Sequence, residues 1–357
     1  MQDSPLKCVL RWAHFRGKDL SNRRISIRSC CRVHLTCIKP FYNMPMKRKF
    51  LFVLALVMSG LPSFASSLGT ATRTVIPSEV QQILNVDYRR MKNSDTAMAM
   101  KAKLLPPNMK QFEDALKDIG VNPDKDLEQI TLASFRTREK NLEMIGVAQG
   151  QFPHKKLNLR LARQKIKGKK VNGAIIYPMA GNMSMTFLDD WTMLFGDEAA
   201  VRAALSARDN SSESLNSNRE ITDMIGSVER GTIWSVLDAK GTQTMLKSAL
   251  GTASNLAEYD DVKTKLLGSR YTMDFDSGVD FNLNVVTSDN VTAATLSSIL
   301  KAGMMFKKMN AASLSEKTAI DSTNVDSDNG RLIVHFKADD KSFQSLLDSP
   351  MFASVTH

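Results

Sequence analysis

Residues 270–309 read RYTMDFDSGVDFNLNVVTSDNVTAATLSSILKAGMMFKKM, and this stretch predicts the fold class. Two runs of strand-forming residues, 270–275 and 279–287, flank Asp276-Ser-Gly278, a turn signal typical of a β-hairpin. Over 290–309, apolar residues recur at helical spacing and predict a long helix. A hairpin that leads directly into a helix favours an α+β fold, in which antiparallel sheet carries helices packed on one face.

The same order of strands and helices is predicted twice along the chain. In the first copy, we expect strands over 96–103, 129–135, 142–149, 173–177, 183–188 and 192–195, and helices over 106–119, 154–167, 197–205 and 218–228. In the second copy, we expect strands over 232–237, 270–275, 279–287, 322–326 and 331–337, and helices over 242–250, 290–309 and 339–347. We interpret the chain as two similar α+β units, with one irregular domain as the alternative. The predicted boundaries are a flexible leader over 66–86, units over 87–230 and 231–350, and a tail over 351–357.

An export signal is predicted over 44–65. Three adjacent cations, Lys47–Lys49, precede an apolar run over 50–61, and small residues then lead to Ala65. This order is typical of a secretory signal peptide, and the apolar run is too short to span a bilayer, which takes roughly 20 residues. We therefore expect cleavage after Ala65 and an exported, periplasmic or secreted protein.

The segment before the signal has two interpretations. Because a signal peptide must stand near the start of translation, residues 1–43 are expected to precede the true initiator, as an untranslated or disordered upstream segment. The alternative is a basic arm in which Cys30, His34 and Cys37 stand at spacings that resemble a metal site. Adjacent Cys30-Cys31 is poor geometry for zinc, which weakens that alternative.

Charge and cysteine are concentrated at the front of the chain. Residues 1–65 hold 12 of the 48 Lys and Arg residues but only 2 of the 37 Asp and Glu residues, so residues 66–357 carry a net charge of +1. A nearly neutral body has no overall field to attract a polyanion, which argues against nucleic acid as a partner. All four cysteines precede residue 44, so the body has no disulfide, thiolate metal site or cysteine nucleophile.

Catalytic and metal patterns are absent or incomplete. Ser298-x-x-Lys301 and Ser327-Asp-Asn329 resemble elements of penicillin-recognising enzymes, but the Lys-Thr-Gly strand is missing. The oxygen-rich run 324–330 departs from calcium-loop spacing and fits a hairpin turn. Methionine pairs such as Met98 and Met100 are better explained by core packing than by copper. We therefore expect no catalytic residue, no metal and no cofactor, and we interpret the protein as a non-enzyme.

One basic stretch is the local electrostatic feature of the body. Eight cations lie within 155–170 with no acid among them, and helical spacing would bury Leu157, Leu161 and Gln164. Such a surface is predicted to meet anionic lipid headgroups or an acidic partner, whereas a merely solvated helix face is the alternative. The candidate binding residues are Lys155, Lys156, Arg160, Arg163, Lys165, Lys167, Lys169 and Lys170.

A resemblance rests on residues 187–205, FLDDWTMLFGDEAAVRAAL. This segment is similar to one that recurs in uncharacterised exported bacterial proteins, where a strand–turn–strand of the form dgtllvGdeaaVraAL leads into a helix within a duplicated α+β unit. The match covers this segment well and the rest of the chain only in layout. It implies the duplicated architecture and a bacterial envelope setting, and it brings no catalytic residue.

Three functions follow as hypotheses. The favoured one is an exported, non-enzymatic envelope protein with a binding or scaffolding role, whose partner is an envelope protein or an anionic membrane surface. A second is a carrier or sensor of a lipid or other apolar ligand, which predicts a cavity of a few hundred cubic ångströms lined by Met and Phe. A third is an enzyme of unfamiliar type, which predicts a raised pKa at carboxylates such as Asp189 and Asp190.

Overall fold

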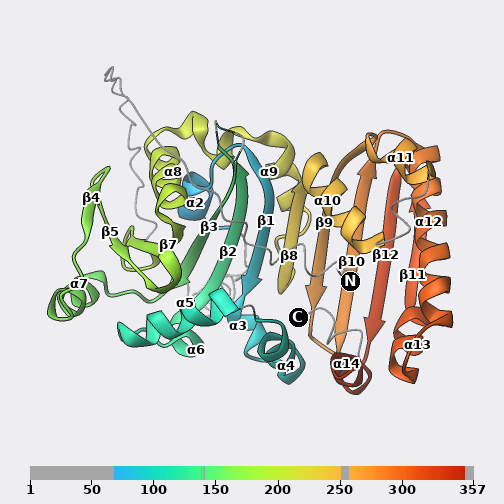
Figure 1. Cartoon of the computed structure of the whole chain (residues 1–357), viewed down its shortest axis with the longest axis horizontal. Coiled ribbons are helices and arrows are strands. Elements are labelled where there is room, and N and C mark those ends of the chain that lie inside the picture. Colours follow the sequence, from blue (N-terminus) through green and yellow to red (C-terminus); the bar gives the residue numbers. More distant parts are fainter. Residues whose placement is uncertain (1–67, 106, 138, 140, 251–256, 350–357) are drawn as a thin grey trace, which may run out of the picture. The chain divides into compact units, whose positions relative to one another are not determined.

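One antiparallel sheet of twelve strands organises the chain, in the order β11-β12-β10-β9-β8-β1-β2-β3-β7-β6-β5-β4 (Figure 1). The structure is a computed structural model, and it describes residues 68–105, 107–137, 139, 141–250 and 257–349. The strands are β1 Val80–Asp87, β2 Leu127–Arg136, β3 Leu142–Gly150, β4 Lys169–Val171, β5 Ala174–Pro178, β6 Met183–Phe187, β7 Thr192–Asp197, β8 Ile233–Asp238, β9 Leu266–Asp274, β10 Val279–Thr287, β11 Thr323–Asp328 and β12 Arg331–Ala338. The predicted signal peptide and all four cysteines lie outside the described residues.

Helices occupy most of the remaining described residues, so the predicted α+β fold class is confirmed. The helices are α2 Thr70–Val75, α3 Tyr88–Met91, α4 Asp95–Leu104, α5 Pro107–Asp118, α6 Pro123–Asp126, α7 His154–Arg163, α8 Glu198–Asp209, α9 Arg219–Gly226, α10 Ala239–Leu250, α11 Ala257–Lys263, α12 Asn290–Met309, α13 Leu314–Asp321 and α14 Asp340–Leu347. Short 3-10 helices are η2 Ala180–Asn182, η3 Ser211–Glu213 and η4 Leu215–Ser217.

Strand β1 joins the two expected units into one sheet. It pairs with β2 on one side and with β8, the first strand of the second unit, on the other. Hydrogen bonds therefore run without a break across the expected boundary near residue 230, and a duplication is not visible as two separate sheets.

Side chains alternate between two faces of the sheet, here named by a helix that packs on each. On the α8 face, Ile83 and Val236 belong to a core that also contains residues of α2, α8 and α9. On the α10 face, one core joins α5 and α7 to β3, β6 and β7, and another joins α10, α11 and α12 to β10, β11 and β12. Helices thus cover both faces of the N-terminal half, whereas those of the C-terminal half gather on the α10 face.

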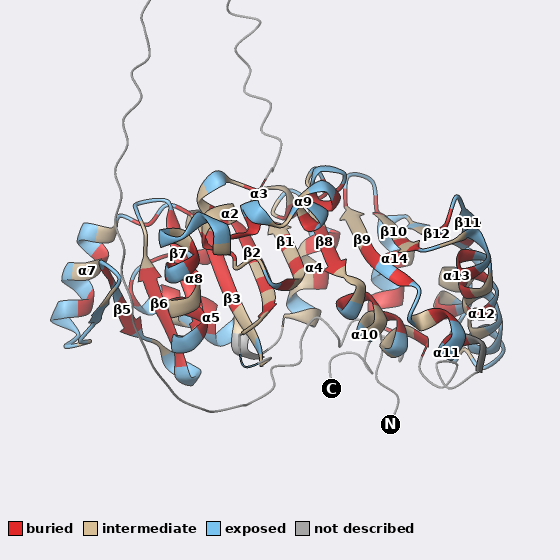
Figure 2. Cartoon of the chain, turned by 90° about the horizontal axis from the view of Figure 1, so that it is seen from above, coloured by how far each residue is buried: buried red, intermediate tan, exposed pale blue. Residues whose placement is uncertain are grey.

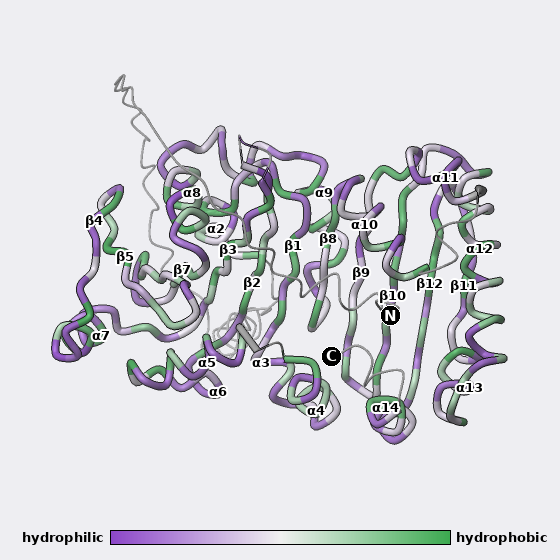
Figure 3. The backbone as a smooth tube through the Cα atoms, viewed as in Figure 1, coloured by the Kyte–Doolittle hydropathy of each residue, from purple (hydrophilic) through white to green (hydrophobic). Residues whose placement is uncertain are grey.

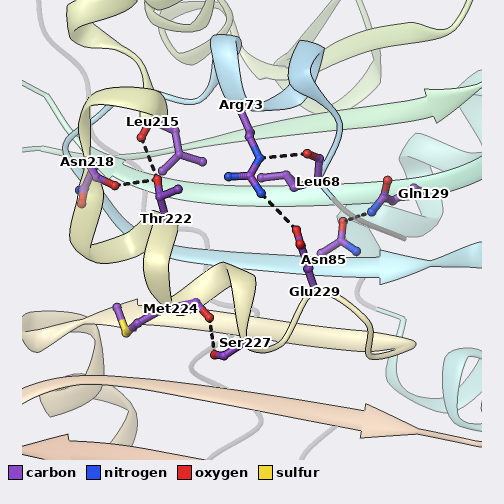
Figure 4. A network of polar contacts seen from close by, with 10 residues as sticks. All are labelled: Leu68, Arg73, Asn85, Gln129, Leu215, Asn218, Thr222, Met224, Ser227 and Glu229. Carbon is purple, nitrogen blue, oxygen red and sulfur yellow. Dashed lines mark hydrogen bonds and ion pairs between the residues drawn. The ribbon is translucent and has the colours of Figure 1, made fainter. Parts of the chain in front are cut away.

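Helix α2 is fixed on the α8 face by polar contacts as well as by its core residues (Figure 4). The Arg73 guanidinium donates to the Leu68 carbonyl oxygen at 3.0 Å and pairs with the Glu229 carboxylate, which follows α9, at 3.1 Å. Beside it, Asn85 on β1 accepts a hydrogen bond from the Gln129 amide at 2.8 Å. These contacts tie the start of the described chain to the middle of the sheet.

Two expectations about the first unit are wrong. Residues 96–103, expected as a strand, lie in α4, because Ser94 caps the helix by accepting a hydrogen bond from the Ala97 amide and because Ala, Met and Lys favour helix. The segment 66–86, expected as a flexible leader, contains α2 and nearly all of β1, an interior strand. A register shift between Val80 and Gln82 breaks the period-two pattern that would have revealed β1.

The hairpins and the long helix are confirmed. Asn329 and Gly330 both have positive φ, 46° and 70°, as the tight turn between β11 and β12 requires. Helix α12 spans the predicted residues, and Asp289 caps it by accepting hydrogen bonds from the Thr292 amide and hydroxyl.

Candidate ligand-binding face

One row of directly opposed residues crosses eleven strands on the α10 face. In order from β5 to β11 it reads Tyr177, Met185, Phe195, Gly146, Leu132, Leu84, Ser235, Tyr271, Leu283, Val334 and Val325. The residues at both ends of this row are buried, but Leu132, Leu84, Tyr271 and Leu283 in the middle are only partly buried. The helices on this face therefore leave the centre of the sheet incompletely covered.

A second row lies two residues away along the strands, buried at its β2 end and partly buried from β1 to β11. From β2 to β11 it reads Ile130, Val86, Ile233, Met273, Phe281, Phe336 and Thr323. Its five central side chains are apolar and all partly buried. Interior strands of a sheet normally bury such side chains beneath another layer, so their exposure is the unusual feature of this face.

We name the partly buried apolar side chains of the two rows the central strip. Its members are Leu84, Val86, Leu132, Ile233, Tyr271, Met273, Phe281, Leu283 and Phe336. The strip crosses six strands from β2 to β12, and at about 4.8 Å between neighbours it is about 24 Å long. The acyl layer of one membrane leaflet is about 15 Å thick, half of a bilayer's hydrocarbon core, so the strip is long enough for an extended acyl chain.

Helices frame the central strip. At the β3 end, Phe195 leans over Gly146 and stacks on Phe112 of α5, with ring centroids 3.8 Å apart. Helix α10 packs on β8 and β9, and α12 packs on β10, β11 and β12 (Figure 1). Helices α4 and α14 close another side, where Met100 and Phe343 share a core with Met273 and Phe336. The central strip is therefore an apolar area of the sheet surface that is bordered by helices.

A small polar side chain, Ser235, lies among the apolar side chains at the centre of the central strip. The Ser235 hydroxyl donates to the Ile83 carbonyl oxygen at 2.7 Å, and the Gln82 amide contacts Ser235 Oγ at 3.4 Å. Tyr271 lies directly opposite Ser235, and burial raises the pKa of its phenol to about 12, so the hydroxyl stays protonated at neutral pH. An apolar surface with a few fixed hydrogen-bonding groups is typical of sites for small amphipathic ligands.

The predicted basic surface lies elsewhere, on α7 and β4 at the opposite edge from β11 (Figures 2 and 3). All eight predicted cations are exposed, and Leu157 and Leu161 are buried as predicted, although Gln164 is exposed. Lys169 pairs with Glu198 at 3.4 Å, whereas the described part of the chain offers the other seven no ion-pair partner. The exposed Leu159 adds an apolar side chain to this surface.

A surface hollow of about 570 Å³ lies between α10 and α11. Its lining residues are polar and include three lysines, and they comprise Lys240, Gln243, Thr244, Lys247, Tyr259, Asp260 and Lys263. This lining differs from the Met- and Phe-lined cavity that the lipid hypothesis predicted.

One of the carboxylates considered for catalysis, Asp190, does not have the predicted electrostatics. Asp190 accepts hydrogen bonds from the His154 backbone amide and ring, and these hold the pKa of its carboxyl below the usual value, opposite to the predicted shift. His335 lies on the sheet face opposite Val334 and contacts Asp280 at 3.1 Å. Across the described ranges, no group of three or more His, Cys, Asp or Glu residues is arranged to hold a metal ion.

A buried charged cluster was missed by the sequence analysis. Glu113 of α5 pairs with Lys101 of α4 at 2.7 Å and accepts a hydrogen bond from the Tyr88 hydroxyl at 3.2 Å. Lys101 also lies 4.8 Å from the centre of the Tyr88 ring. These contacts link α4 to α5 beside the central strip. The sequence did not reveal the cluster because its residues come from separate helices and are brought together only in the folded structure.

Comparisons with known proteins give little guidance. No protein-family model matches the chain, and no curated protein matches it. A solved structure described as "Structure of crystal form I of TP0453" is 12% identical, covers 77% of this chain and 95% of its own, and has a TM-score of 0.42. This likeness is too distant to assign a shared function.

Proposed function

We propose that this chain is an exported, non-enzymatic binding protein of the bacterial envelope that carries an elongated apolar ligand, such as a lipid acyl chain, on the central strip. The observation that supports the proposal is the pair of cross-sheet rows, of which the first is buried at both ends and both are only partly buried in the middle. Export is supported by the signal peptide expected over 44–65. Within the described residues, no helix combines the length and apolarity needed to cross a bilayer.

The chemistry of the strip favours an acyl chain over a polar ligand. Its nine side chains are aliphatic, aromatic or thioether groups, and flexible Met273 can adapt to the shape of a chain. The Tyr271 hydroxyl offers a hydrogen bond to a carbonyl or ester oxygen near the middle, whereas the Ser235 hydroxyl already donates to the Ile83 carbonyl oxygen. Each strip side chain is at most about a third exposed, so covering it with a ligand contributes at most about 1 kcal/mol, a third of the value for full burial.

Titration with palmitate tests the proposal. Leu283 points into the strip, whereas its neighbour Asn284 lies on the opposite sheet face, so Leu283→Glu and Asn284→Glu place the same charge on the same strand but on different faces. We expect palmitate to bind with a negative heat-capacity change, to lose its affinity in Leu283→Glu and to retain it in Asn284→Glu.

A fold control separates lost binding from lost structure. Thermal unfolding of both variants should stay cooperative, and the milder Leu283→Ala should weaken binding about fivefold. Equal palmitate affinity in Leu283→Glu and the unchanged protein would contradict the proposed site.

A second candidate function concerns the basic surface. The seven cations of α7, β4 and the segment between them that have no ion-pair partner among the described residues support adsorption to an anionic partner through this edge. This interaction would accompany ligand carriage, since the two surfaces do not share residues.

A further inference from the structure

The last turns of α12 expose large apolar side chains to solvent. Met305, Phe306 and Met309 are 69%, 62% and 72% exposed, and Leu314 at the start of α13 is 79% exposed. We name these four residues the α12 end patch. Single exposed apolar residues are ordinary, but four large ones within ten positions indicate an interaction surface.

The patch continues a face of α12 that carries no charge. On the side away from buried Leu296 and Ile299, exposed Val291, Ser298 and Ala302 precede the patch at helical spacing. An exposed helix face in contact only with water would normally carry charged residues. The outer side of the helix thus carries apolar or small residues, and its inner side carries apolar residues. This is an unusual pattern for a helix at the edge of a sheet.

Cations outnumber accessible acids around the patch. Lys301, Lys307 and Lys317 are exposed and have no ion-pair partner within the described part of the chain, whereas Lys308 pairs with Asp321. Helix α12 contains no Asp or Glu. The nearby Glu316 is buried and accepts a hydrogen bond from the Ala312 amide at 2.9 Å. The surroundings of the patch are therefore positively charged.

We propose that the α12 end patch docks the protein on an anionic lipid bilayer, with its apolar side chains inserted among the headgroups and its lysines on the lipid phosphates. Apolar residues rimmed by Lys, with flexible Met and a Phe at the centre, are the composition of interfacial membrane helices. A second copy of the chain fits less well, because patch-to-patch contact would oppose the lysines of both copies with no acid on α12 to receive them.

This docking is a function beyond ligand carriage and uses other residues. The patch lies on the outer side of α12, whereas the central strip lies on the sheet. Vesicle binding and palmitate binding are therefore separate measurements, and failure of one leaves the other unaffected.

Sedimentation with vesicles of phosphatidylglycerol and phosphatidylcholine tests the proposal with the whole protein. The variant Phe306→Ser/Met309→Ser should lower the partition coefficient about a hundredfold, at about tenfold for each side chain. Its matched control is Val291→Ser, which removes an equally exposed apolar residue at the other end of the same helix and should change binding little.

Charge variants distinguish the contribution of the lysines near the α12 end patch from that of the basic surface on α7. Each lysine near an anionic surface contributes about fivefold to partitioning, so Lys301→Glu/Lys307→Glu should reduce binding by at least about 25-fold. Lys155→Glu/Lys156→Glu on α7 alters the other edge of the sheet and should leave most of the insertion signal. Vesicles of phosphatidylcholine alone should bind the unchanged protein much more weakly.

Insertion has a direct optical signature. In Phe306→Trp, tryptophan emission should shift to the blue when anionic vesicles are added, because the indole leaves water. The proposal is overturned if emission does not shift, if Phe306→Ser/Met309→Ser binds vesicles like the unchanged protein, or if the α7 variant alone abolishes binding. A lipid-free dimer that the patch variant dissociates would also overturn it, in favour of a second copy.

Discussion

Replacing Gly146 with alanine should destabilise the protein, because the position has no room for a methyl group. A Cβ at this residue would lie 2.2, 2.4 and 2.5 Å from three atoms of the Phe195 ring. Carbon atoms in contact are normally 3.5–4.0 Å apart, so the ring would have to retreat by more than about 1 Å. Phe195 cannot do so freely, since it is buried and stacked on Phe112 at a centroid distance of 3.8 Å.

The expected cost is that of overpacking a well-filled core. Such substitutions typically cost about 1–3 kcal/mol, and the depth of the overlap places Gly146→Ala in the upper part of that range. Urea unfolding should show a lower midpoint with an unchanged slope, because the surface exposed on unfolding stays the same.

A second glycine provides the control. At Gly303, inside α12, no atom lies within 4 Å of the position that a Cβ would occupy. Gly303→Ala should therefore stabilise the protein by about 0.5–1 kcal/mol through the better helix propensity of alanine. A Gly146→Ala protein as stable as the unchanged one would refute the described packing of Phe195 and hence the closed end of the central strip.

Three further predictions concern pH, charge and processing. Burial raises the pKa of Tyr259 and Tyr271 from 10.0 to about 12, so both phenols ionise earlier in the unfolded chain. The contribution of these tyrosines to stability should be constant below pH 10 and fall by up to about 2–3 kcal/mol per tyrosine between pH 10 and 12. Native and urea-unfolded proteins with the same phenolate titration would contradict this. Binding of the basic surface to anionic vesicles should be weak and should vanish at high salt. Replacing Lys155, Lys156, Arg160 and Arg163 with glutamate should reduce this binding. Unchanged binding would refute the role of that surface. Intact mass of the natively expressed protein should correspond to a chain that begins at Ser66, and a species that begins at Met1 would contradict export.

Local signals in the sequence predicted much of the secondary structure. Asp276-Ser-Gly278 and Asp328-Asn-Gly330 fix their hairpins because tight turns require particular backbone angles, which these residues adopt readily. The apolar spacing of α12 predicted both ends of that helix. Where a local pattern was disturbed the prediction failed, as at the register shift in β1 and at the alternating small residues of α4.

The candidate site depended on contacts between distant segments. The central strip exists because β1 pairs with β8, which places Leu84 opposite Ser235, some 150 residues later in the chain. No local pattern specifies that pairing, so the two rows could not be found from the sequence. The α12 end patch was detectable in principle, since Met305, Phe306 and Met309 fall outside the buried stripe of a helix that was itself predicted.

Native mass spectrometry of the protein recovered from the cell envelope decides whether the central strip holds a ligand. We expect an added mass that corresponds to a lipid, present on the unchanged protein and absent from Leu283→Glu. A protein that carries no apolar adduct, or one that retains the same adduct in Leu283→Glu, would contradict the assignment of the central strip as a ligand site.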